Sequence, residues 1–446
     1  MADIAPDDLI ESLLGAGSSV SAEHVANNLA ASHLETARAF GFLKACAAPA
    51  IPSPPRELPD VLNRLADAAA DYGDVALLED LIFATADPAS AEAAWTHLHA
   101  PEELAGSNGD ALFAVYDLNA GPLTYDFVQF LVLAERFRLA SGKPHLRLIV
   151  VPGEHEGFRN FSQRDRFLST VSKEWRLRQL VMRAAHLVPA LAGITRFRSR
   201  KSAAAFLGRV EPGLVFPPGF DSKAPACPYH LAFVMQFATQ GADIRSLAAP
   251  PLTSALVRRL LRELAGTRPV VTITLRQSEF QPARNSRLDQ WLRFAGACET
   301  RGLFPLFVPD TEALLAGRDA ELGGFASLPL AALSLPVRAA VYQESWHNML
   351  ANGGPYTLCL YNARARFSMF KLLVPDVHTA SAAFHASQGL TPGTQLPFAG
   401  PMQRLVWEDD SLDVLERELD SVLALNPPTA CMPRASSGAQ HSKSIN

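Results

Sequence analysis

One segment of this 446-residue chain gathers residue types that suit the binding of an anion. Arg276 follows the β-branched run 270–275, which predicts a buried strand. Arg284, Asn285 and Ser286 come next, and Ser286 is the predicted N-cap of a helix. Ligands of open α/β sheets bind outside the carboxyl ends of strands, guanidinium groups fork onto phosphates, and helix N-termini favour anions. The segment therefore predicts an anion site. The alternative is a surface loop whose arginines pair with nearby carboxylates.

A second candidate is the turn Asn352-Gly353-Gly354, which precedes a predicted apolar helix over 356–361. Glycines let the backbone approach a ligand closely, so a phosphate or a ribose could lie on these amides. Glu344, upstream of the turn, is a candidate for binding ribose hydroxyls. The alternatives are an ordinary loop-to-helix turn and a solvated or core-edge glutamate.

Polar residues also follow the first two predicted strands, 111–116 and 146–151. They are Asp117, Asn119, Tyr125 and Asp126 after the first strand, and Glu154, His155, Glu156 and Arg159 after the second. The carboxyl ends of parallel strands meet at one edge of a sheet, so both sets are expected to face a cleft. Asp126 or His155 could act there as a general base on an acceptor hydroxyl. Asp126 could instead merely stabilise a helix N-terminus.

The chain around these residues divides into four predicted parts. Residues 1–104 carry apolar residues at three- and four-residue spacing, which predicts an all-α helical bundle or helical-hairpin domain. Strand–helix–strand units predict a first Rossmann-like domain with a linker over 105–262 and a second over 263–425. Residues 426–446 are predicted to be a disordered tail. The helical part is expected to act as a scaffold, binding a protein partner or self-associating.

Composition argues against several classes of function. A formal net charge of -5 argues against nucleic-acid binding that depends on the charge of the whole protein. The five cysteines are widely spaced without a CxxC pair, which argues against a disulfide framework or a zinc module and favours a reducing cytoplasm. The sequence shows no basic signal-peptide region and no apolar run long enough for a membrane span. No Asp-x-Asp, P-loop or HExxH motif is present, so no metal site is expected.

The strand end Thr274-Leu275-Arg276 with Glu279 resembles the fingerprint of the fucosyltransferase-like branch of the GT-B glycosyltransferases. Members of that branch carry a strand-terminal His-x-Arg with an acid three residues after the Arg, and Thr274 stands here in place of the His. The strings at 270–286, 352–355 and 397–410 also resemble bacterial proteins of unknown activity that are grouped as glycosyltransferase-like. The resemblance covers roughly residues 110–425. It implies that Arg276 contacts a donor diphosphate.

The resemblance implies an α/β, GT-B-like pair of Rossmann-like domains with parallel sheets, preceded by the helical domain. Together with the cysteine usage and the missing metal motifs, it predicts a cytoplasmic, metal-independent glycosyltransferase without a cofactor, which moves a sugar from a nucleotide diphospho-sugar to a glycan or other hydroxyl acceptor. The expected catalytic residues are Arg276, Asp126 and His155. The expected donor-binding residues are Thr274, Arg276, Glu279, Arg284, Asn285, Ser286, Glu344, Asn352, Gly353 and Gly354. The expected acceptor-side residues are Asp117, Asn119, Tyr125, Glu156 and Arg159. The alternatives are a sugar-nucleotide epimerase or hydrolase, and a non-catalytic glycan-binding or scaffold protein.

Overall fold

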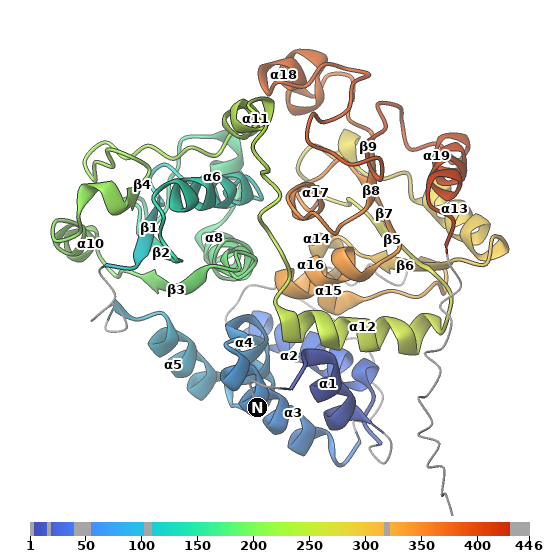
Figure 1. Cartoon of the computed structure of the whole chain (residues 1–446), viewed down its shortest axis with the longest axis horizontal. Coiled ribbons are helices and arrows are strands. Elements are labelled where there is room, and N and C mark those ends of the chain that lie inside the picture. Colours follow the sequence, from blue (N-terminus) through green and yellow to red (C-terminus); the bar gives the residue numbers. More distant parts are fainter. Residues whose placement is uncertain (1–3, 16–18, 40–54, 102–108, 316–321, 429–446) are drawn as a thin grey trace, which may run out of the picture.

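The computed structural model describes residues 4–15, 19–39, 55–101, 109–315 and 322–428. Most of the predicted tail, from residue 429 onward, lies outside the described residues. Figure 1 shows three layers of structure: helices near the N-terminus at the bottom, one sheet on the left and a second sheet on the right. None of the helices in the described ranges is both long enough and apolar enough to cross a membrane.

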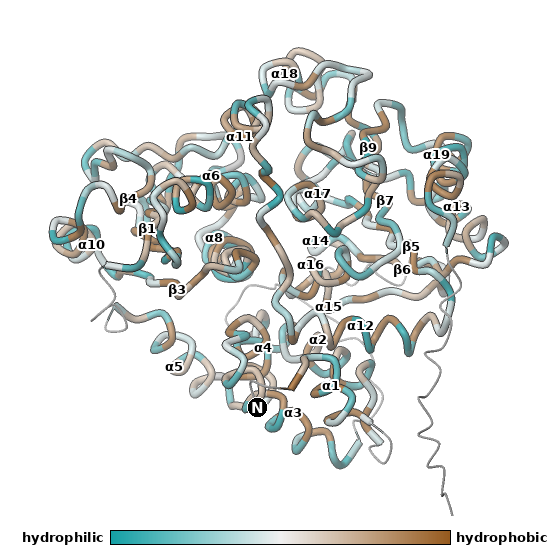
Figure 2. The backbone as a smooth tube through the Cα atoms, in the orientation of Figure 1, coloured by the Kyte–Doolittle hydropathy of each residue, from teal (hydrophilic) through white to brown (hydrophobic). Residues whose placement is uncertain are grey.

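The described residues of the N-terminal part form helices and no strands. The helices are α1 (Pro6–Leu14), α2 (Ala22–Ala39), α3 (Leu58–Tyr72), α4 (Val75–Thr85) and α5 (Pro88–Leu98). Two aspartates cap them, because Asp74 accepts from the Leu77 N–H at 3.0 Å and Asp87 accepts from the Ala89 N–H at the same distance. The apolar faces of α1 and α2 pack against α12 (Pro251–Ala265). Apolar and polar stretches alternate along α12, as its position between two layers requires (Figure 2).

The first sheet is parallel throughout, with the order β3-β2-β1-β4. Its strands are β1 (Ala111–Asp117), β2 (His145–Val151), β3 (Leu191–Arg196) and β4 (Val215–Phe216). Its helical segments are α6 (Phe127–Ala140), α7 (Gln163–Phe167), α8 (Thr170–Arg176), the π-helical η2 (Leu177–Met182), α9 (Arg183–Ala185), α10 (Arg200–Leu207), η3 (Pro212–Leu214) and α11 (Leu231–Thr239). Every residue of β1 is buried, which is why this strand has a continuous apolar sequence.

The second sheet is also parallel, with the order β6-β5-β7-β8-β9. Its strands are β5 (Val270–Thr274), β6 (Phe304–Val308), β7 (His347–Ala351), β8 (Phe367–Phe370) and β9 (Gln403–Leu405). Besides α12, its helical segments are η4 (Pro282–Arg284), α13 (Leu288–Thr300), α14 (Thr311–Leu315), α15 (Pro329–Leu333), α16 (Leu335–Glu344), α17 (Tyr356–Leu360), η6 (His378–Ala380), α18 (Ala382–Ser387) and α19 (Leu412–Leu425). The α/β class, the two parallel sheets and the preceding helices are therefore confirmed.

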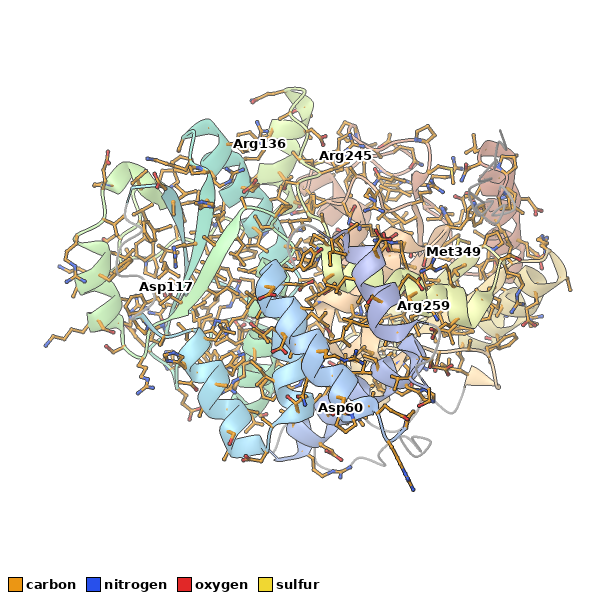
Figure 3. The ribbon with its side chains drawn as sticks, turned by 60° about the horizontal axis from the view of Figure 1, so that its bottom comes forward. Asp60, Asp117, Arg136, Arg245, Arg259 and Met349 are labelled. Carbon is orange, nitrogen blue, oxygen red and sulfur yellow. The ribbon has the colours of Figure 1, made fainter. Side chains whose placement is uncertain are left out.

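Surface ion pairs connect α12 to the N-terminal helices. Arg258 contacts Asp7 at 2.9 Å, and Arg259 and Arg262 both contact Glu11. Figure 3 shows Arg259 beside these helices. Such exposed pairs contribute little to stability, so the apolar contacts beneath them hold the layers together.

A buried group of charged residues lies where the three layers meet. We call it the junction cluster, and it consists of His33, Glu79, Asp80, His99, Arg183, His186 and Ser334. Arg183 of α9 contacts Glu79 at 2.7 Å and also contacts Asp80. His33 reaches Asp80 at 2.7 Å, and His186 reaches Glu79 at 3.0 Å. The cluster therefore connects the N-terminal helices to both sheet-bearing parts.

Candidate active site

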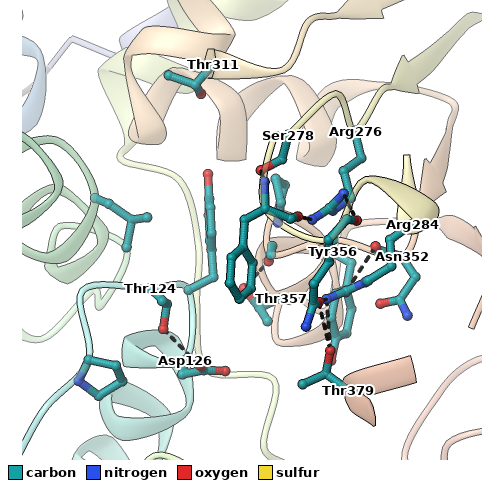
Figure 4. A pocket seen from close by; sticks show the side chains of 18 of the residues that line it. Thr124, Asp126, Arg276, Ser278, Arg284, Thr311, Asn352, Tyr356, Thr357 and Thr379 are labelled. Atoms are coloured by element: carbon teal, nitrogen blue, oxygen red, sulfur yellow. Dashed lines mark hydrogen bonds between the residues drawn. The ribbon is translucent and has the colours of Figure 1, made fainter. Parts of the chain in front are cut away.

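A cavity of about 730 Å³ lies between the two sheet-bearing parts. In the second sheet, β6 is added on one side of β5 and β7 on the other, so the strand order reverses between β5 and β7. The loops that follow these two strands line the cavity. In the first sheet, the strand order reverses between β1 and β4, and the loop after β1 lines the opposite wall of the cavity. Ligands of doubly wound sheets bind at such switch points, outside the carboxyl ends of the strands. The topology therefore places both predicted clusters around one pocket (Figure 4).

Arg276 lines the pocket, but most of its hydrogen bonds hold its own loop together. Its guanidinium donates to the Gln281 carbonyl at 3.1 Å, to the Phe280 carbonyl and to the Asn285 side-chain oxygen. Its backbone N–H donates to Ser286 Oγ at 2.9 Å. A guanidinium has five N–H groups, so part of its donor capacity stays available for a ligand. Arg276 thus mainly stabilises its own loop, and it also contributes a positive charge to the pocket wall.

Arg284 is held at this wall by hydrogen bonds to uncharged groups of the described residues. It donates to Gln281 Oε1 at 3.1 Å, to Thr379 Oγ1 at 3.3 Å and to the Asn352 carbonyl at 3.3 Å, while its Nε has no partner among the described residues. It makes no ion pair with a carboxylate in the described part of the chain. Burial, with repulsion from Arg276, lowers the pKa of Arg284 to about 10, so it remains charged at neutral pH. The pocket wall therefore carries an uncompensated positive charge.

The turn after β7 contributes a close backbone surface and a free amide. Asn352 is buried, and its Nδ2 has no partner among the described residues. Gly354 lies under the ring of Tyr125, because a Cβ built on it would lie 2.2 Å from Tyr125 Cδ2. The Tyr125 hydroxyl accepts from Arg338 at 3.0 Å. Tyr125 thus reaches from the first part of the chain into the second, directly beside Asp126.

We predict that Gly354→Ala displaces the Tyr125 ring and lowers the free energy of unfolding by about 1–3 kcal/mol, the usual cost of overpacking. The matched control is Gly353→Ala, whose Cβ would meet nothing closer than 3.7 Å. That control is expected to stay within about 0.5 kcal/mol of the wild type. Chemical unfolding of the two variants measures the difference, and equal stability would contradict the contact.

Asp126 lies on the opposite wall from Arg284 (Figure 4). Its side chain is solvent-exposed within the pocket, and Thr124 Oγ1 donates to it at 2.8 Å. Enclosure by the surrounding protein raises the pKa of Asp126, against the opposing effects of Thr124 and nearby cations. Asp126 occupies the N-cap position of α6, but its side chain makes no capping hydrogen bond. The carboxylate is therefore available for proton transfer.

Arg159 also lines the pocket, but it is held by Asp165. Its Nε donates to both Asp165 oxygens at 2.9 Å, and its Nη1 donates to the Ala120 carbonyl at 2.7 Å. Asp165 in turn forms a capping box with Ser162 at the start of α7. Arg159 thus braces the β1 loop against α7, and its charge is already compensated.

Several candidates of the first part do not line the pocket. Asp117 is buried and pairs with Arg200 at 2.8 Å, so its carboxylate is held in place by this ion pair. Asn119 accepts from the Glu154 N–H at 2.7 Å and so shapes a turn. His155 and Glu156 are exposed, because residues 153–158 fold back in a tight antiparallel turn that carries them away from the pocket. The role predicted for His155 therefore has no support in its position.

Several donor-side candidates also lie outside the pocket lining. Glu344 ends α16 at the opposite edge of the sheet, before β7 begins, and pairs with Arg258 at 3.0 Å. Glu279 is exposed. Asn285 and Ser286 bind their own loop, and Arg287, not Ser286, is the N-cap of α13.

The candidates that the structure brings to the pocket are Tyr125, Asp126, Arg159, Thr274, Arg276, Arg284, Asn352, Gly353 and Gly354. Thr274 is the last residue of β5 and shares a 2.9 Å hydrogen bond with the buried Tyr342 hydroxyl. Arg338 also lines the pocket, and its signal in the sequence is weak, because it is a charged residue in the mostly apolar first part of helix α16. His230 and Tyr356 line the pocket too and have no such signal, so none of these three residues is predicted from the sequence.

No protein-family profile matches this chain, and no curated protein matches it. Eleven chains of solved structures do. A family 9 glycosyl transferase from Veillonella parvula is 9% identical, with a TM-score of 0.42, and the match covers 71% of this chain and 98% of that chain. The E. coli ADP-heptose lps heptosyltransferase II is 13% identical, with a TM-score of 0.38, covering 70% and 99%. The E. coli heptosyltransferase WaaC with ADP is 13% identical, with a TM-score of 0.36, covering 72% and 100%.

These similarities are distant, and they do not point to the fucosyltransferase-like branch. Among the described residues no group of three or more His, Cys, Asp or Glu is placed to hold a metal ion. The chain has an α/β fold in which two parallel, Rossmann-like sheets face one pocket.

Proposed function

We propose that this protein is a metal-independent glycosyltransferase that transfers a sugar from a nucleotide diphospho-sugar to a hydroxyl acceptor. The observation that carries the proposal is Arg284, a cation without a carboxylate partner at the switch point of the second sheet. It faces Asp126 across the pocket. An enzyme of this kind needs a charge that stabilises the leaving group and a base on the other side of the sugar.

The residues divide the reaction between the two walls. The diphosphate lies against Arg284, the Asn352 amide and the Gly353-Gly354 backbone, with Arg276 nearby. The acceptor enters from the side of Asp126. Its hydroxyl oxygen forms a bond to the anomeric carbon while its proton passes to the Asp126 carboxylate. The bond from the anomeric carbon to the phosphate oxygen breaks, and the diphosphate leaves with that electron pair, stabilised by Arg284.

The pocket has the size and the polarity that this ligand requires. Small-molecule sites usually have volumes of about 300–1,000 Å³, and the cavity of 730 Å³ lies within that range. The aromatic side chains of Tyr229, Phe280 and Tyr356 offer apolar surface beside the charged groups. Binding of a protein partner or self-association through residues 1–104 stays a prediction.

We predict that Arg284→Met weakens the binding of a nucleoside diphosphate about 10- to 100-fold, because it removes a charge-assisted hydrogen bond worth about 1.5–3 kcal/mol. Thermal-shift screening with ADP, GDP, UDP and CDP identifies the nucleotide, and calorimetric titration measures the affinity. The matched control is Arg287→Met, which removes the same charge from a half-exposed side chain outside the pocket.

Three outcomes separate the candidate functions. Nucleotide binding that Arg284→Met weakens and Arg287→Met does not would support the proposal. Consumption of the nucleotide-sugar without any acceptor would instead identify an epimerase or hydrolase that uses the same pocket. If none of the four nucleotides stabilises the wild type, the proposal is wrong and a non-catalytic scaffold becomes the better explanation.

A further inference from the structure

Arg338 is a second buried cation in the pocket wall, and nothing in the proposed reaction uses it. It belongs to α16, lines the pocket and is only 3% exposed. Its Nε donates to the Ala331 carbonyl at 2.6 Å and its Nη1 donates to the Tyr125 hydroxyl at 3.0 Å. Its Nη2 has no partner among the described residues.

The charge on this side chain has no counter-ion. Within the described ranges no carboxylate lies within ion-pair distance of Arg338, and its direct partners are a carbonyl and a phenol. Burial opposes the charge, but Tyr125, Tyr342 and Asp310 outweigh it and hold the pKa of Arg338 above its ordinary value. A permanently charged guanidinium with a buried, unbonded N–H is unfavourable in a folded protein. A ligand oxyanion at this position would supply both missing partners.

The surroundings of Arg338 differ from those of Arg284. The groups that act electrostatically on Arg284 are Arg276, Tyr356 and Asp126, whereas those that act on Arg338 are Tyr125, Tyr342 and Asp310. The Tyr125 ring packs on Gly354, and its hydroxyl is bonded to Arg338. The pocket therefore presents two cationic positions with different neighbours, and the proposed reaction places the diphosphate at Arg284.

We propose, building on the proposed glycosyltransferase function, that Arg338 and the Tyr125 hydroxyl form a second oxyanion subsite. The natural ligands then carry an anionic group besides the diphosphate. Two sources fit this chemistry: the carboxylate of an acidic donor sugar, and a phosphate or carboxylate on the acceptor. A hydrogen bond to a charged group gives about a 10- to 100-fold preference over a neutral analogue.

The test uses the full chain and ligand pairs that differ in one charge. UDP-glucose is compared with UDP-glucuronate, and GDP-mannose with GDP-mannuronate, by calorimetric titration. Glucose 6-phosphate is compared with glucose on protein saturated with the nucleoside diphosphate that it binds. A preference of tenfold or more for the acidic donor identifies the sugar as the source. A preference confined to glucose 6-phosphate identifies the acceptor.

The variants connect the preference to Arg338. Arg338→Met is expected to bring the acidic-to-neutral ratio close to one while the nucleoside diphosphate itself still binds. Tyr125→Phe keeps the ring on Gly354 but removes the hydroxyl, so it is expected to reduce the ratio in part. Arg364→Met, at a 59% exposed side chain outside the pocket, is the control and is expected to leave the ratio unchanged.

The outcomes also separate this inference from the proposed function. Nucleotide binding without any acidic preference, or with a preference that Arg338→Met leaves intact, would overturn the subsite alone. A wild type that binds no nucleotide would overturn the proposed function, and the subsite with it. We expect Arg338→Met to melt at or above the wild-type temperature, because an apolar group replaces a buried charge without a counter-ion. Such a melting temperature would show that a lost preference does not come from misfolding.

Discussion

Replacing Arg183 with Met is expected to lower the free energy of unfolding by about 3–5 kcal/mol, the cost of breaking a buried ion pair from one side. Arg183 is 3% exposed, and Glu79 and Asp80 are 2% and 1% exposed. Without the guanidinium, two carboxylates of neighbouring residues would remain buried with only histidines and Ser334 as partners. Because the junction cluster connects all three layers, its loss should loosen the whole chain.

Chemical unfolding followed by circular dichroism measures this effect. The matched control is Arg262→Met, which removes an equal charge from a 58% exposed side chain paired with Glu11. Exposed pairs contribute about 0–1 kcal/mol, so the control should remain close to the wild type. Equal stability of the two variants would show that the junction cluster does not hold the layers together.

The same cluster predicts acid sensitivity. Burial opposes ionisation of Glu79, but His186 and Arg183 outweigh it and hold its pKa well below the usual value. Burial likewise opposes ionisation of Asp80, yet Arg183 and His33 lower its pKa. A carboxyl with a depressed folded pKa stabilises the fold above its unfolded pKa of about 4, and this contribution is lost as the pH falls toward the folded value. Arg183→Met should lose much of this dependence.

The second large effect is expected at Asp126. Asp126→Asn keeps the shape of the side chain but cannot accept the acceptor proton, so kcat should fall about 10²- to 10⁴-fold, the usual contribution of a general base. Nucleoside diphosphate affinity should change little, because Asp126 lies on the wall opposite Arg284. Initial rates with the nucleotide-sugar that stabilises the wild type most strongly provide the measurement.

The pH profile gives this prediction a second readout. The base acts in its ionised form, so activity should fall as the pH drops through the Asp126 pKa, which enclosure in the pocket raises above its ordinary value. The isosteric control is Asp289→Asn at a 70% exposed side chain of α13. If Asp126→Asn keeps both the wild-type kcat and the acid limb, another group is the base.

The sequence alone predicts the parts of the fold that depend on local pattern. The runs at 111–116, 146–151, 270–275 and 304–308 are apolar because both faces of these parallel strands are buried, and β1, β2, β5 and β6 lie there. Strand β7 has no such signal, since the polar side chains of His347 and Asn348 are buried within it. His347 shares a hydrogen bond with Ser368 of β8, and Asn348 donates to the Tyr342 carbonyl of α16, so both partners lie on other elements.

The periodicity of apolar residues is a local property, so the sequence alone predicts that Arg276, Arg284 and Asp126 follow strand ends in two parallel sheets. The contacts made in the folded chain determine which of these side chains stay available to a ligand. Arg276 is bonded to its own loop, Arg284 is not paired with a carboxylate among the described residues, and Arg338 enters the pocket from the mostly apolar helix α16. The partners of Arg284 and Arg338 include Asn352, Thr379 and Tyr125, which lie far away in the sequence, so a local pattern cannot reveal them.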